Sequence, residues 1–236
     1  MKVTFIMHSS FLVELEHCAL LFDYYEGDMP MIDLEKPLYV FASHSHGDHF
    51  SPHIFALAME YENIHYILSD DIPENMIPDD RKGRKSVKDL TLFVSPHNRY
   101  TLDGLTIETL ESTDMGVAYL ITCEGKSLYH AGDLNCWVWE GGSIFQNEQM
   151  KELYQKELQL LSGRHLDAAF VPLDPRQERE FGLGMLGFLA AAEADSVFPM
   201  HMWGDFRVVP RFCGEHPEYA DKIMRIEQRG QSFLLP

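Results

Sequence analysis

The stretch 44–49, His-Ser-His-Gly-Asp-His, constrains this chain more than any other. It places three imidazoles and one carboxylate within six positions, directly after the apolar run 38–42, which is typical of a buried strand. The period of two along a strand points His44 and His46 the same way, and a turn at Gly47 brings Asp48 and His49 beside them. Such groups are ligands of Zn²⁺, Mn²⁺ and Fe²⁺. The stretch therefore predicts a metal site, with a surface histidine cluster as the alternative.

The hydrophobic pattern predicts alternating strands and helices without repeats or low-complexity linkers. Ser51-Pro52 is typical of a helix start, with serine as the N-cap and proline at the first helical position. Strands are predicted at 3–7, 11–15, 19–23, 38–43, 64–68, 91–95, 167–173 and 196–200. Hairpins join 99–102 to 105–110 and 117–123 to 126–131. Helices are predicted at 52–61, 146–162, 184–194 and 216–228.

The motif resembles the His-x-His-x-Asp-His signature of the metallo-β-lactamase-fold superfamily. Further segments match in order and spacing over residues 1 to 205: the strands 5–14 and 20–23, the Gly-Asp pair 132–133, and 199–201. Within the superfamily, the chain resembles metal-dependent hydrolases grouped with ascorbate-6-phosphate lactonases. The resemblance implies one α/β domain over 1–236, a four-layer αββα sandwich with two mixed sheets face to face and helices outside. The metals are expected on loops at one edge of the sheets.

The resemblance also implies a ligand set for two metal ions, with zinc expected and manganese or iron as alternatives. His44 and His46 would hold metal one, Asp48 and His49 metal two, Asp133 would bridge both ions, and His201 would complete metal two. A carboxylate can bridge two cations, whereas a neutral imidazole cannot, and two close cations can activate one hydroxide near neutral pH. The alternative roles are a turn residue for Asp133 and a packed strand-end histidine for His201.

One departure from the family pattern concerns metal one. The family supplies a third histidine from a loop before the Gly-Asp pair, and at that place this chain has 111–116 without a histidine. Asp114 is the simplest substitute, and a turn residue before Gly116 is its alternative role. His97 and His130 are the nearest other candidates, and His130 either lines the site or is buried. The site for metal one is therefore expected to bind its ion weakly, to be richer in oxygen ligands, or to be empty. More oxygen ligands would shift its preference toward Mn²⁺.

Several residues are expected around the metals. His8 lies at the tip between the first two strands, as a site residue or as a turn histidine, and Asp23 either orients a ligand histidine or caps a strand. Arg176 and Arg179 leave strand 167–173, as a clamp for an anionic substrate or as partners in surface salt bridges. The tryptophans at 137, 139 and 203 each follow a predicted ligand closely and form either a pocket wall or core packing.

Composition limits the partners and the compartment. The net charge of −18, from 19 basic and 37 acidic residues, disfavours binding to a nucleic acid backbone, and the basic run at 81–85 is interpreted as a charge-balanced loop. No signal peptide or membrane span is expected. The four cysteines include no Cys-x-x-Cys and are expected to be reduced and partly buried. These features predict a cytoplasmic protein with a small-molecule substrate, and leave the oligomeric state open.

Together these observations predict a metallohydrolase acting on a small, anionic ester, lactone or phosphodiester. A metal-activated hydroxide would attack the carbonyl or phosphorus, the cations would stabilise the developing oxyanion, and Asp48 or a bound water would handle the proton. Asp48 and Asp133 are the predicted catalytic residues. Two alternatives are an iron-dependent oxidoreductase on the same fold and a non-catalytic metal- or ligand-binding protein with a degraded site.

Overall fold

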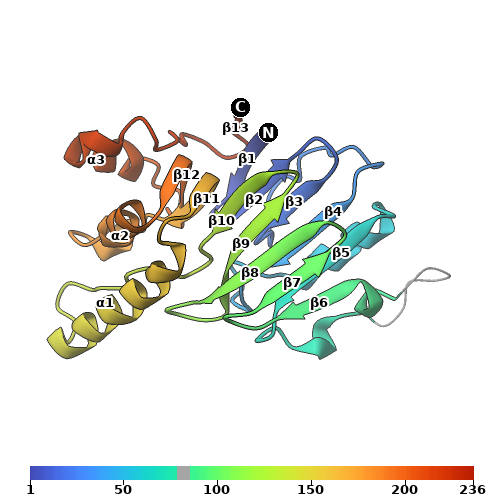
Figure 1. Cartoon of the computed structure of the whole chain (residues 1–236), viewed down its shortest axis with the longest axis horizontal. Helices are drawn as coiled ribbons and strands as arrows, with labels where there is room; N and C mark the ends of the chain where they lie inside the picture. Colours follow the sequence, from blue (N-terminus) through green and yellow to red (C-terminus); the bar gives the residue numbers. More distant parts are fainter. Residues whose placement is uncertain (79–85) are drawn as a thin grey trace. The chain divides into compact units, whose positions relative to one another are not determined.

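The computed structural model describes residues 1–78 and 86–236. It contains two mixed β-sheets, one of seven strands and one of six (Figure 1). The basic run at 81–85 lies outside the described residues. One compact unit comprises Met1–Ser95 and Arg229–Pro236, and a second comprises Pro96–Gln228. The predicted α/β class with two mixed sheets is confirmed. The single domain over 1–236 stays a prediction.

The first unit contains the seven-stranded sheet in the order β13-β1-β2-β3-β4-β5-β6. Its strands are β1 (Lys2–Met7), β2 (Ser10–Glu14), β3 (Ala19–Phe22), β4 (Leu38–Ala42), β5 (Ile64–Ser69), β6 (Thr91–Val94) and β13 (Ser232–Leu234). Neighbouring strands from β13 to β3 pair antiparallel, and those from β3 to β6 pair parallel. All five residues of β4 are buried, as expected of an interior parallel strand. Strands β1, β3 and β4 run in the same direction and therefore end at the same edge.

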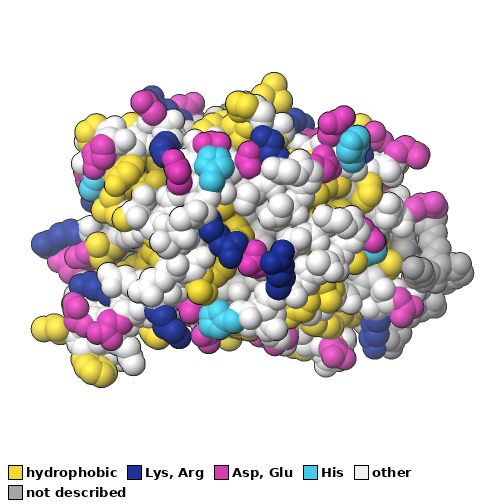
Figure 2. Space-filling view, in the orientation of Figure 1, with side chains coloured by type: hydrophobic (Ala, Val, Ile, Leu, Met, Phe, Trp, Pro, Cys, Tyr) yellow, Lys and Arg dark blue, Asp and Glu magenta, His cyan; other side chains and the backbone are white. Residues whose placement is uncertain are grey.

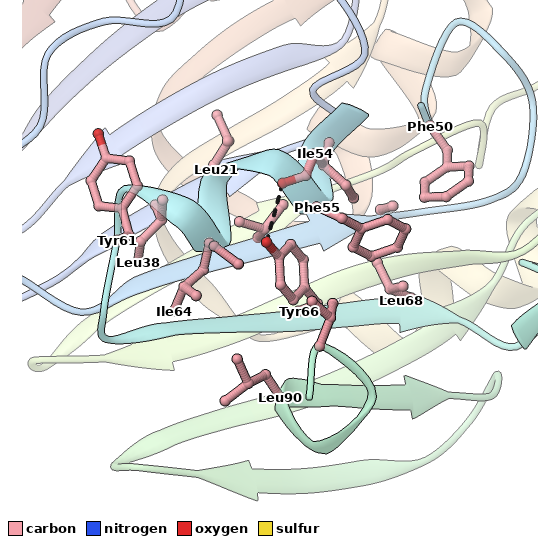
Figure 3. Packing of buried hydrophobic residues seen from close by; sticks show 14 of the residues in the cluster. Leu21, Leu38, Phe50, Ile54, Phe55, Tyr61, Ile64, Tyr66, Leu68 and Leu90 are labelled. Atoms are coloured by element: carbon pink, nitrogen blue, oxygen red, sulfur yellow. Dashed lines mark hydrogen bonds between the residues drawn. The ribbon is translucent and has the colours of Figure 1, made fainter. Parts of the chain in front are cut away.

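A helix packs on part of this sheet and contributes side chains to the hydrophobic core of the first unit. The predicted helix at 52–61 begins at Ser51-Pro52 as expected, but it forms a 3₁₀ helix, η1 (Pro52–Met59), that buries Ile54 and Phe55. These side chains pack with Tyr66 and Leu68 of β5 (Figure 3), and the Tyr66 hydroxyl donates a hydrogen bond of 3.1 Å to the Ile54 carbonyl. Shorter 3₁₀ helices are η2 (Glu74–Met76) and η3 (Lys88–Leu90).

The second unit repeats the pattern of antiparallel strands followed by parallel ones. Its six strands are β7 (Arg99–Leu102), β8 (Leu105–Glu111), β9 (Val117–Cys123), β10 (Lys126–His130), β11 (His165–Pro172) and β12 (Glu193–Met200), which lie in the order β12-β11-β10-β9-β8-β7. The strands from β7 to β10 pair antiparallel, and β10, β11 and β12 pair parallel. Consequently β8, β10, β11 and β12 end at one edge of the sheet.

The helices of this unit are α1 (Ile144–Leu158), α2 (Leu183–Ala191) and α3 (Val208–Glu215), with 3₁₀ helices η4 (Gln159–Leu161), η5 (Pro175–Gln177) and η6 (Pro217–Tyr219). Helix α2 packs on β11 and β12, and α1 packs on α2 (Figure 1). The rings of Tyr129 in β10 and Phe188 in α2 stack with centroids 5.4 Å apart.

The predicted helix at 216–228 is wrong. Helix α3 instead precedes it, and it tolerates Pro210 because that residue lies in the first turn, where its missing N–H costs no intrahelical hydrogen bond. The following segment bonds to β12: the Val197 N–H donates to Lys222 and the Met224 N–H donates to Val197, each at 2.8 Å. The extended pairing with a strand uses the backbone groups that a helix would have needed.

The surface and the cysteines agree with the composition. Acidic and basic side chains are interspersed on the face seen in Figure 2. All four cysteines are free and buried, more completely than the partial burial that was predicted. Within residues 1–78 and 86–236, no helix combines the length and apolar character needed to cross a membrane.

Candidate metal centre

The loop after β4 holds the histidine motif in a tight turn. The backbone N–H groups of His49 and Phe50 both donate to the His46 carbonyl, at 3.0 and 2.9 Å. His44 and His49 are fully buried, and His44 Nε2 lies 3.0 Å from His46 Nδ1. The turn therefore gathers the imidazoles of the motif, as the period of the strand and Gly47 predicted.

Asp23, directly after β3, accepts several hydrogen bonds from this loop. Its fully buried carboxylate accepts hydrogen bonds of 2.7 Å from the Ser43 N–H, the Ser43 hydroxyl and His49 Nδ1. Because the Ser43 hydroxyl gives its proton to Asp23, the His44 Nδ1, 2.9 Å from Ser43 Oγ, donates to that oxygen. Both histidines thus carry their proton on Nδ1 and keep the Nε2 lone pair for a ligand.

His8 and Asp48 add two potential metal ligands at the same edge of the sheet in the first unit. His8 Nε2 lies 3.4 Å from Asp48 Oδ2, and donor atoms of His8, Asp48 and His49 all lie within 4.8 Å of one another. Hydrogen bonding from His8 holds the pKa of the Asp48 carboxyl well below its usual range, since it outweighs the opposing effect of burial. Asp48 is therefore a carboxylate at neutral pH, as a metal ligand must be, although the lowered pKa also makes it a weaker base.

The second unit places Asp133 and His201 together after β10 and β12. His201 Nε2 lies 3.3 Å from Asp133 Oδ1, and both side chains are almost fully buried. His201 Nδ1 lies 2.9 Å from Asp174 Oδ2, at the end of β11. This carboxylate–imidazole contact fixes the proton on Nδ1 and turns Nε2 toward Asp133, as Asp23 fixes His49 in the first unit.

Asp174 also binds Arg176, which changes the expected role of that arginine. Burial would raise the pKa of Asp174, but hydrogen bonds from His201 and Arg176 lower it to about 2. The guanidinium donates to Asp174 through Nε and Nη2, and Arg179 pairs with Glu140 at 2.6 Å. Both predicted anion-binding arginines are therefore engaged by carboxylates.

The remaining candidates lie in the second unit. Asp114 is exposed and lines a cavity together with Asp133 and His201. His130 is buried, and its Nδ1 accepts a 3.2 Å hydrogen bond from the Gly132 N–H, which shapes the turn before Asp133. His97 contacts both carboxylate oxygens of Glu157, at 3.0 and 2.8 Å.

Three residues of the candidate site have a strained backbone conformation. His8, Asp23 and His201 adopt positive φ values of 48°, 43° and 61°, a region that non-glycine residues rarely enter. Such strain persists where the surrounding contacts over-determine it, commonly at functional sites. All three residues directly follow a strand, so the strain aims their side chains along the common edge of each sheet.

Sequence reasoning missed Ser43 and Asp174 as residues that orient the histidines. Ser43 directly precedes the motif, and Asp174 closes the strand predicted at 167–173, just as Asp23 closes the strand predicted at 19–23. Acidic residues at the carboxyl end of a strand next to a ligand-bearing strand were the available signal.

The imidazole nitrogens and carboxylate oxygens gathered in each unit are suitable ligands for a divalent metal ion. The histidines offer Nε2 atoms from imidazoles whose tautomer is fixed by a buried carboxylate, which is the arrangement usual for metal-ligating histidine. Carboxylates and imidazoles together suit Zn²⁺ and, with more oxygen, Mn²⁺.

Comparisons with known proteins agree with this chemistry. Residues 2–142 match the family described as the β-lactamase superfamily domain. A UPF0173 metal-dependent hydrolase of Korarchaeum cryptofilum is 26% identical over 235 residues, covering 95% of this chain and 91% of the relative. Its counterpart in Alkaliphilus metalliredigens is 25% identical over 186 residues, 73% of each chain. A metallo hydrolase structure from Ignicoccus hospitalis aligns over 100% of this chain and 99% of its own, with 17% identity and a TM-score of 0.64.

The chain therefore belongs to the β-lactamase superfamily, as the resemblance implied. The predicted enzyme class, a metal-dependent hydrolase of that superfamily, is confirmed by these relatives.

Proposed function

We propose that the protein is a zinc-dependent hydrolase of small esters, lactones or phosphodiesters. The observation that carries the proposal is the pair of buried carboxylate–imidazole contacts, Asp23 with His49 and Asp174 with His201. A buried carboxylate that fixes the Nδ1 proton raises the basicity of Nε2 and suits that atom to a metal.

The proposed zinc ligands are, in the first unit, His44, His46, Asp48 and His49, and in the second unit, Asp133, His201 and Asp114. The resemblance implies two zinc ions for this set. Asp114 is the least constrained ligand, since its side chain is exposed, so the ion that it serves would bind more weakly.

Bound zinc would supply a water activated near neutral pH and positive charge to stabilise the anionic transition state. The chain's own residues orient and hold protons around it. Asp48 or a bound water would take the proton released by the nucleophile, and His8 would hold the Asp48 carboxylate in place. The lowered pKa of Asp48 keeps it ionised but makes it a weaker base. Asp23 and Asp174 would keep the histidines in their ligand tautomer.

The anionic substrate expected from Arg176 and Arg179 has less local support, because both guanidiniums bind carboxylates. An uncharged ester or lactone therefore leads the substrate classes that we propose. A cytoplasmic location remains our expectation.

The test is hydrolysis by the purified full chain of a panel with one ester, one lactone and one phosphodiester. Activity should disappear on chelation and return with zinc. His49→Gln should lower activity by more than the roughly 10–100-fold that loss of an outer-shell partner costs. The control is His53→Ala, which removes an exposed imidazole four residues away. Zinc-independent turnover, or a His49→Gln variant as active as the control, would contradict the proposal.

A further inference from the structure

A cavity of about 370 Å³ adjoins Asp133 and His201 in the second unit. Its volume lies within the range of small-molecule pockets. Trp137, Trp139 and Met150 form its apolar part, and Asp114 and Arg176 are among its polar residues. Because three of the proposed zinc ligands, Asp114, Asp133 and His201, line it, whatever fills it lies beside the reacting group.

Two of the chain's three tryptophans, Trp137 and Trp139, line this cavity, and Trp203 contacts its lining residue Arg176. The rings of Trp137 and Trp139 are parallel within 9°, with centroids 6.2 Å apart. Trp137 Nε1 donates a 2.9 Å hydrogen bond to the Asp133 carbonyl, which ties this aromatic wall to a proposed ligand. Trp203 packs edge-on against His201 and carries the Arg176 guanidinium 4.3 Å from its ring centroid.

The aromatic wall remains accessible. Trp139 is 40% exposed, although an indole of this size gains free energy by burial, and its ring lines the cavity. An aromatic side chain held in place and left exposed beside a reaction centre is suited to stacking on a flat ring of a ligand.

The lining side chains offer an anionic occupant no uncompensated cation. Asp114 and Asp133 contribute carboxylates, whose charge is offset when they bind zinc, and Arg176 gives its Nε and Nη2 protons to buried Asp174. An anionic ring would therefore gain no ion pair with a side chain of the cavity.

We propose that this cavity binds an uncharged, flat aromatic group of the substrate, next to the bond that is hydrolysed. The inference rests on the proposed function and narrows it to esters or lactones that carry an aryl or arylmethyl group. The ring stacks on Trp139 and Trp137, and the cleaved group points toward Asp133 and His201.

The test uses the full-length protein as purified, with its metal and with ¹⁵N-labelled indoles. The indole N–H signals of Trp137 and Trp139 report the cavity directly, and the signal of Trp203, whose Nε1 donates to Asp174, reports its flank. Three probes of similar size are titrated: benzyl alcohol, cyclohexylmethanol, and benzenesulfonate, an anionic ring and a weak metal ligand. Benzyl alcohol should shift the Trp137 and Trp139 signals and bind about 3–10-fold more tightly than cyclohexylmethanol. Benzenesulfonate should bind more weakly than benzyl alcohol.

Variants of the wall sharpen the test. Trp139→Phe keeps a ring and should retain the preference for benzyl alcohol, whereas Trp139→Leu keeps apolar bulk and should lose it. Phe145→Ala is the control, because Phe145 is 76% exposed and does not line the cavity. Since the probe comparison needs no variant, it decides the matter even if a tryptophan substitution unfolds the protein.

Equal binding of benzyl alcohol and cyclohexylmethanol, tighter binding of benzenesulfonate, or no indole shift would overturn the aryl site. Zinc content and hydrolysis are measured on the same samples. A ring preference without zinc or hydrolysis would refute the proposed function alone, and zinc-dependent hydrolysis without ring preference would refute the aryl site alone.

Discussion

Replacing Asp23 with asparagine tests the link between the buried carboxylate and metal binding. Three donors reach Asp23: the Ser43 N–H at Oδ1, and the Ser43 hydroxyl and His49 Nδ1 at Oδ2, each at 2.7 Å. An asparagine keeps one acceptor and places an NH₂ group at the other position. In either orientation of the amide, at least one N–H donor meets another donor.

The lowest-cost relief moves the proton of His49 from Nδ1 to Nε2, so that Nδ1 accepts from the new amide. This tautomer removes the lone pair that a metal needs. Loss of an outer-shell partner typically weakens metal affinity 10–100-fold, or about 1.4–2.8 kcal/mol. We therefore expect Asp23→Asn to bind zinc about 10–100-fold more weakly, and to lose about 1–3 kcal/mol of folding stability with the charge-assisted hydrogen bonds.

The assay is competition for zinc against a chromogenic chelator, with urea unfolding alongside. The control is Asp33→Asn, which changes an exposed carboxylate that accepts one local hydrogen bond from the Glu35 N–H. A folded Asp23→Asn protein that binds zinc within twofold of the wild type would refute the reasoning.

The remaining predictions concern packing, pH and metal removal. Gly184→Ala should lower the free energy of unfolding in urea by about 1–3 kcal/mol, because the added Cβ would lie 1.7 Å from Asn135 Oδ1. The control Gly214→Ala in α3 meets nothing within 4 Å and should leave this free energy unchanged or raise it. Equal effects of the two substitutions would contradict this prediction. Glu108→Gln should cost about 0.5–1 kcal/mol at pH 7, since hydrogen bonding from Arg164 lowers the pKa of Glu108. This stabilisation is fully present above the pKa of Glu108 in the unfolded state, and it is lost as the pH falls through the lower pKa of Glu108 in the folded state. The difference in free energy of unfolding between wild type and variant should therefore fade below about pH 4 and not above it. Chelation should lower the melting temperature by about 5–10 °C if zinc is bound at about 100 times its Kd, and an unchanged melting temperature would contradict a bound metal.

The motif 44–49 was predictable from the residues themselves, because it closely follows the apolar run 38–42. Asp133 and His201 were expected only through the family resemblance, since their short motifs carry little signal alone. The buried parallel strand β4 also follows directly from its five apolar residues.

The contacts that orient these residues depend on which strands are neighbours. Asp174 meets His201 because β11 pairs with β12, and Ser43 meets Asp23 because β4 pairs with β3. Parallel pairing across a connection of a dozen or more residues leaves little local signal. The contact of Arg176 with Asp174 is different, because the two residues are only two positions apart, and it matches the salt bridge expected from the sequence as the alternative to an anion clamp.

The end of the second unit shows a competition between local and long-range bonding. Residues 216–228 carry a pattern compatible with a helix, but the backbone of 222–224 bonds to Val197 of β12 instead. β13 is similar: its three residues pair with β1, more than two hundred positions away, and no local pattern marks so short a strand.

The most direct test of the account is the metal content of gently purified protein, measured by elemental analysis for the wild type and Asp114→Ala. We expect two zinc ions per chain in the wild type and one in the variant, whose weaker site has lost a ligand. A single ion unaffected by the substitution would contradict the two-zinc set, and iron in its place would favour the oxidoreductase alternative. A chain without metal would refute the central claim that these histidines and carboxylates form a metal centre.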